Sequence, residues 1–80
     1  MVKIYEHLRR VQVGPFAVRL WIGGWEPDLS EVVLNRAIEA VGGCDRPETA
    51  CERVGRIEGV NAVEVLDSSG NGALLYPEWP

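Results

Sequence analysis

The sequence predicts an α+β fold, a two-layer sandwich in which one four-stranded antiparallel sheet carries two helices on one face, in the order ββααββ. Three observations lead to this prediction. Residues 16–22 alternate between apolar and polar side chains, which is typical of a strand with one buried face. Two amphipathic helical segments then follow each other directly. Finally, a loop rich in Gly, Ser, Asn and Asp joins two short apolar runs near the C-terminal end.

Residues 2–22 are expected to form the first hairpin. Gly14-Pro15 predicts the turn, because proline presets a turn backbone and cannot donate to a ladder. Residues 2–11 match a strand by alternation and a helix by their i, i+4, i+7 spacing. We favour a strand, since a continuous hairpin lets two long segments cover one core. Its apolar pattern then requires a β-bulge near Arg9–Arg10. One face of the second strand is apolar: Phe16, Val18, Leu20 and Ile22.

The first helix is expected to begin at Asp28. Glu31 stands three residues later, which is the spacing of a capping box that satisfies free N–H groups in the first turn. Gly42-Gly43 is expected to end the helix through a left-handed cap. The apolar stripe comprises Val33, Leu34, Ala37, Ile38 and Val41.

A second helix start follows at once. Asp45 and Glu48 repeat the capping spacing, and Pro47 stands in the first turn, where a helix tolerates proline. Gly55 is expected to weaken this helix by about 1 kcal/mol relative to alanine. Gly59 is expected to end it. The apolar stripe comprises Ala50, Cys51, Val54 and Ile57.

The C-terminal part predicts a second hairpin. Residues 60–66 read as one strand and residues 73–76 as its return strand, halted by Pro77. The loop at 67–72, with sequence DSSGNG, has the composition of a hairpin connection.

Length and charge limit the function classes. Eighty residues predict one domain, 1–80, and a net charge of −4 argues against nucleic-acid binding and against an anionic membrane surface. With no long apolar run and only two cysteines, we expect a cytoplasmic protein. Residues 1–25 carry four basic and one acidic side chain, a net +3, whereas residues 26–80 carry four basic and eleven acidic ones, a net −7. This split favours either self-association or ordinary solvated faces.

The sequence contains no recognised catalytic or metal-binding motif. One histidine, His7, and two cysteines separated by six residues make no known ligand set, and the paired glycines fit no phosphate-binding loop. We therefore expect no cofactor, no metal and no catalytic residue. A thiol enzyme using Cys44, just before a predicted helix, with His7 as its base is the third and weakest hypothesis.

The aromatic residues are the candidate binding residues. Exposed Trp and Tyr are enriched in interfaces because they bury a large rigid area. The first hypothesis is therefore a non-catalytic interaction module that self-associates, as a homodimer, through its sheet face or a strand edge. The second is a small-molecule or peptide binding domain with an aromatic cleft. The alternative is that the tryptophans only cover open ends of the core. The candidate residues are Trp21, Trp25, Tyr76, Trp79 and Arg19.

Overall fold

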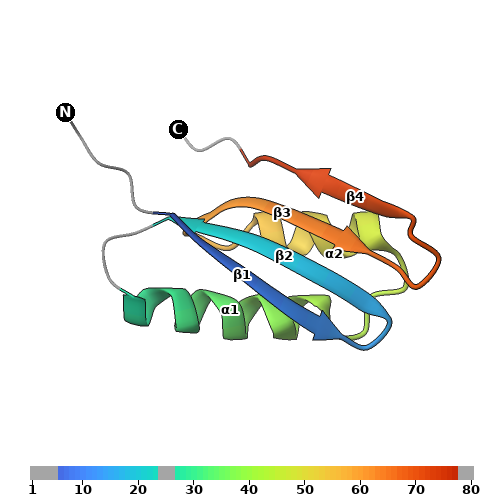
Figure 1. Ribbon diagram of the computed structural model, residues 1–80, viewed down its shortest axis with the longest axis horizontal. Helices are drawn as coiled ribbons and strands as arrows, with labels where there is room; N and C mark the ends of the chain where they lie inside the picture. The colour runs from blue at the N-terminus through green and yellow to red at the C-terminus, as the bar shows by residue number, and fades with distance from the viewer. Residues whose placement is uncertain (1–5, 24–26, 78–80) are drawn as a thin grey trace.

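The computed structural model describes residues 6–23 and 27–77. In this range the chain forms four strands and two helices in the predicted order ββααββ (Figure 1). The strands make one antiparallel sheet with the order β1-β2-β3-β4. Strands β2 and β3 are therefore neighbours in the sheet, although both helices separate them in the sequence. The elements are β1 (Glu6–Val13), β2 (Phe16–Gly23), α1 (Pro27–Val41), α2 (Pro47–Gly55), β3 (Val60–Leu66) and β4 (Gly72–Leu75).

The first hairpin is confirmed from Glu6 onward, while residues 2–5 of its predicted first strand lie outside the described residues; its predicted bulge is wrong. Strands β1 and β2 pair without interruption from Glu6–Gly23 to Val13–Phe16. Because Leu8 lies on the opposite face from Val11, no register slip at Arg9–Arg10 is needed to explain the pattern. Gly14 makes the turn with φ of 57°. The irregularity lies instead in β3, where the pairing of β2 passes from Ala62 to Val60 and skips Asn61.

Both helices are confirmed, but neither begins where its predicted capping box places it. Helix α1 begins at Pro27, so Asp28 lies inside the helix, and proline suits a first helical position. Helix α2 begins at Pro47, and its N-cap is Arg46, which makes no side-chain capping hydrogen bond. Asp28 is therefore the second helical residue of α1, whereas Asp45 stands one residue before the N-cap of α2.

The predicted helix ends are correct for α1 and too late for α2. Gly43, with φ of 84°, follows α1, and the N–H of Cys44 donates to the carbonyl of Val41 at 3.1 Å. Helix α2 already ends at Gly55, a buried glycine where a Cβ atom would lie only 2.5 Å from Leu75. Gly59, with φ of 99°, turns the chain into β3.

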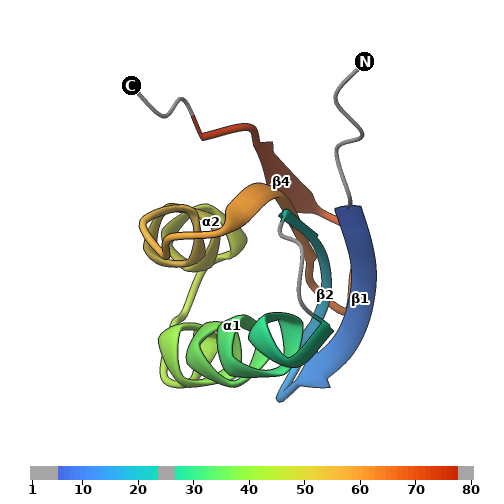
Figure 2. The same ribbon diagram turned by 90° about the vertical axis from the view of Figure 1, so that its left-hand side faces the viewer.

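The core draws on both helices and on the sheet. Helix α1 contacts β1 and β2, helix α2 contacts β3 and β4, and the two helices contact each other (Figure 2). The predicted apolar face of β2 is confirmed, because Phe16, Val18, Leu20 and Ile22 are each at most 3% exposed. The buried cluster also contains Val33, Leu34, Ala37, Val41, Ala50, Cys51, Val54, Val60, Val63 and Val65.

The second hairpin agrees with its prediction to within one residue. Strand β3 has the predicted bounds, and β4 begins at Gly72 instead of Ala73. Oδ1 of Asp67 accepts hydrogen bonds from the N–H groups of Ser69 and Asn71, each at 2.9 Å. This acceptor orders the loop, which explains why Asp stands at its first position.

Candidate functional site

The second face of the sheet is lined by residues that alternate with the buried ones. On β2 these are Ala17 and Arg19, which are exposed, and Trp21, which is half-buried. The pairing of the strands extends this alternation to β1, β3 and β4. We call this set the exposed sheet face; it comprises Leu8, Arg10, Gln12, Ala17, Arg19, Trp21, Ala62, Glu64, Leu66, Gly72 and Leu74.

One row across the exposed sheet face is apolar. Leu8 pairs with Trp21, and Trp21 pairs with Ala62. Leu8 is 44% exposed, whereas Ala62, the strand partner of Trp21, is only 5% exposed. Tyr76 follows β4 directly and is 68% exposed, and alternation with Leu75, which packs against the core, places it at the end of this row. Together these side chains present aromatic and aliphatic surface to solvent.

The neighbouring row is charged. Arg10 pairs with Arg19, and Arg19 pairs with Glu64. Arg19 Nε lies 3.7 Å from Glu64 Oε1, an exposed ion pair that contributes little to stability. Two arginines directly opposite each other on a sheet are unfavourable. Among the described residues, no carboxylate lies within ion-pair distance of Arg10. The row therefore contains two arginines and one carboxylate, that of Glu64, and has an excess of positive charge.

The exposed sheet face is uneven. Between β1 and β2 it has a shallow hollow of about 370 Å³, whose lining includes Arg10, Gln12, Ala17 and Arg19. Across β3 and β4 it carries leucine side chains instead. Leu74 is 49% exposed and Leu66 is partly buried. One half of the face is thus recessed and basic, and the other half bears aliphatic side chains and Glu64.

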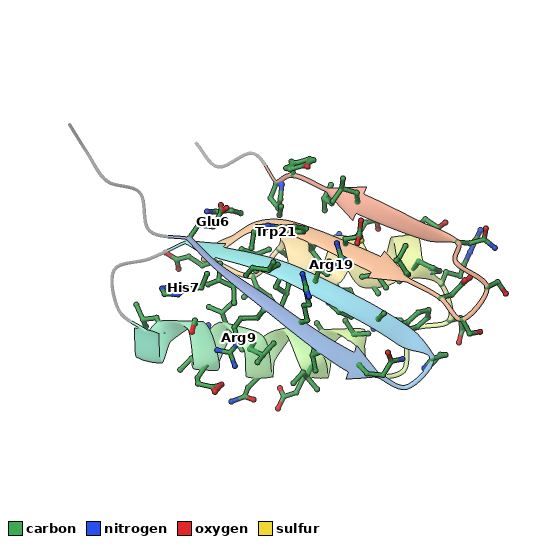
Figure 3. All side chains as sticks on the ribbon, in the orientation of Figure 1. Glu6, His7, Arg9, Arg19 and Trp21 are labelled. Atoms are coloured by element: carbon green, nitrogen blue, oxygen red, sulfur yellow. The ribbon has the colours of Figure 1, made fainter. Side chains whose placement is uncertain are left out.

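The two edges of the sheet are protected. Arg9 of β1 faces the core side, where Nη1 donates to Ser30 Oγ at 3.2 Å and Nη2 lies 3.3 Å from Glu31 Oε1 (Figure 3). Inward-pointing charged residues on an edge strand disfavour pairing with a further strand. The other edge, β4, has only four residues and is followed closely by Pro77. Both edges therefore disfavour pairing with a further strand.

The five predicted binding residues have different outcomes. Trp21 and Arg19 lie next to each other along β2, two residues apart on the exposed sheet face (Figure 3). Tyr76 is exposed at the margin of the same face. Trp25 and Trp79 lie outside the described residues, so the aromatic cleft remains a prediction. Sequence reasoning did not single out Leu8, Arg10, Glu64, Leu66 or Leu74, although strict alternation from Trp21 across the paired strands identifies them.

The hypothetical thiol dyad is not assembled. The contacts of Arg9 place the beginning of β1 beside the first turns of α1, and His7 is two residues away. Cys44 lies beyond the other end of this 15-residue helix, which spans about 22 Å. The Sγ atom of Cys44 donates to the carbonyl of Ala40 at 3.3 Å, at the C-terminal end of α1.

Cys51 is not an activated thiol. It is 2% exposed in the core, and its Sγ donates to the carbonyl of Ala73 at 3.2 Å. Burial raises the pKa of the Cys51 thiol from 9.0 to about 11; a backbone hydrogen bond from Val65 opposes this increase, and Glu48 and Glu64 add to it. At neutral pH the group is therefore a protonated, packed side chain.

Within residues 6–23 and 27–77, no group of three His, Cys, Asp or Glu side chains is placed to hold a metal ion. A second hollow, of about 410 Å³, lies between α1 and the turn before β3; it is lined by Gly23, Leu29, Val32, Val33, Arg36, Glu58 and Gly59. In the described part of the chain, neither helix has the length and apolar character needed to cross a membrane.

Comparison with protein-family models, with curated proteins and with solved structures finds no match to this chain.

Proposed function

We propose that this chain is a non-catalytic interaction module that forms a homodimer through the exposed sheet face. The observation that carries the proposal is the apolar row of Leu8, Trp21 and Tyr76 lying beside a charged row, on a sheet whose edges are both protected. Partly exposed aromatic and aliphatic side chains flanked by charges are characteristic of protein interfaces.

The proposal includes a two-layer sandwich in which both helices cover one face of the sheet. Figure 2, where α1 and α2 lie next to each other, supports it, as do the contacts of α1 with β1 and β2 and of α2 with β3 and β4. In such a sandwich the exposed sheet face has no covering layer within one copy. We also infer a reducing compartment such as the cytoplasm, which the two unpaired thiols, Cys44 and Cys51, support.

The size of the chain favours a second copy as the partner. A domain of this length buries only about 63% of its unfolded surface, and association stabilises the folded state by mass action. Strand spacing and rise give the sheet a footprint of about 20 Å by 25 Å, or about 500 Å² per copy. That is smaller than the roughly 800 Å² per partner of a standard interface, so we expect a dissociation constant of about 1–100 μM.

Sedimentation velocity from about 0.5 μM to about 500 μM tests the proposal, because this range spans the expected dissociation constant. Leu8→Asp should shift the protein to monomer, since it buries a charge in the apolar row. The matched control is Leu29→Asp on α1, where a leucine of similar exposure (49% against 44%) lies off the sheet. A wild-type protein that stays monomeric throughout, or equal weakening by both variants, contradicts the proposal.

A further inference from the structure

We propose that the two copies pack face to face about a twofold axis parallel to the strands, so that β1 and β2 of each copy cover β4 and β3 of the other. This inference rests on the proposed self-association and specifies which residues meet. The axis passes between β2 and β3, the two central strands. Rotation about it exchanges the two halves of the sheet and keeps each residue at its own level along the strands.

Charge selects this axis. At the level of the charged row, Arg19 of one copy meets Glu64 of the second copy, and the contact repeats by symmetry. The same Glu64 approaches Arg10, which has no carboxylate partner among the described residues of its own copy. An axis running across the strands at this level instead stacks Arg10, Arg19 and Glu64 each on its own counterpart. Facing like charges cost several kcal/mol in an interface.

Shape selects the same axis. The hollow beside Arg10, Gln12, Ala17 and Arg19 occupies the β1–β2 half of the face. The rotation places the β3–β4 half of the second copy above it, with Leu66 over Ala17 and Leu74 over Arg10. Two partly exposed leucines therefore enter a recess. Sheets packed face to face lie about 10 Å apart, which is the separation that such interdigitating side chains fill.

The apolar row is also complementary to itself under this rotation. Trp21 faces Ala62 of the second copy, so the largest side chain of the row meets the smallest. Leu8 faces Tyr76 of the second copy. Each contact occurs twice, as an isologous interface requires.

Charge exchange tests the pairing. Arg19→Glu alone and Glu64→Arg alone should each weaken self-association at least about 100-fold, because each creates two like-charge contacts. Mixing the two variants should restore association as a heterodimer. One copy then carries glutamate at positions 19 and 64, the other carries arginine at both, and each glutamate faces an arginine. The double variant R19E/E64R should again self-associate. Arg36→Glu on α1, with the same charge change away from the sheet, is the control and should leave association unchanged.

Distance measurement tests the direction of the axis. Ser69 lies at the exposed tip of the β3–β4 loop. Spin labels on Ser69→Cys, in a Cys44→Ala background that leaves only the buried Cys51, should lie about 15–20 Å apart in the dimer. An axis across the strands places the same labels at opposite ends, about 30 Å or more apart.

The outcomes separate the two proposals. A wild-type protein that is monomeric at every concentration overturns the proposed function, and this inference with it. A wild-type dimer that tolerates Arg19→Glu, or whose Ser69 labels lie about 30 Å or more apart, overturns this geometry alone. A dimer that needs the charge match and has close labels supports both.

Discussion

The buried thiol of Cys51 makes the stability of the fold depend on pH in the alkaline range. Burial raises its pKa from 9.0 to about 11 in the folded state, whereas the unfolded chain ionises the thiol near the ordinary value. A group whose folded pKa is raised stabilises the fold below its unfolded pKa. That stabilisation is lost as the pH rises through the window from about 9 to about 11.

The size of the loss follows from the shift. Each pKa unit corresponds to about 1.4 kcal/mol, so a shift of about two units limits the total to about 3 kcal/mol. Linkage then predicts that the free energy of unfolding is lower than at neutral pH by about 1 kcal/mol at pH 10 and by about 2 kcal/mol at pH 11. Cys51 is 2% exposed, so solvent screening reduces these values little.

Urea unfolding at a series of pH values measures this loss, with Cys51→Ala as the reference. The variant lacks the thiol but keeps every other titrating group, so the difference between the two pH profiles isolates Cys51. We expect the profiles to run parallel below pH 8.5 and to converge above it. Profiles that stay parallel up to pH 11 refute the argument. Alkylation at pH 8 is a second readout, in which Cys44 should react and Cys51 should not.

Two further changes test the second hairpin. Gly72→Ala should lower the free energy of unfolding by about 1–3 kcal/mol in chemical denaturation, because the added Cβ would clash with the carbonyl oxygen of Val65; unchanged stability would show that this close approach is absent. Asp67→Ala should lower the free energy of unfolding by about 1 kcal/mol through loss of two loop hydrogen bonds. Asp67→Asn keeps an acceptor and should recover most of that loss, and equal losses for both variants would contradict the role given to Oδ1.

Much of the fold was predictable because burial acts on patterns that are local in the chain. Phe16, Val18, Leu20 and Ile22 are spaced for one face of a strand, and all four are buried. Capping was not predictable in the same way. A D-x-x-E spacing is short and common among acidic residues, and both helices begin instead at a proline, which suits the first helical position.

The candidate site was predicted only in part. Trp21 and Arg19 followed from alternation within one strand. Their neighbours, Arg10, Glu64 and Leu74, come from other strands, and only the register of the sheet brings them together. The predicted bulge at Arg9–Arg10 would have moved half of β1 to the other face, and the uninterrupted pairing removed that ambiguity.

The sequence by itself determined the order ββααββ, the buried face of β2 and the net charge, because each depends on residue type and on spacing along the chain. The tertiary structure alone decided that Arg10, Arg19 and Glu64 form one row beside a hollow, and that Arg9 closes the edge of β1 by reaching α1. The physical reason is that a row across a sheet joins residues as far apart in the chain as Arg10 and Leu74, 64 positions, whose proximity depends on strand order and register.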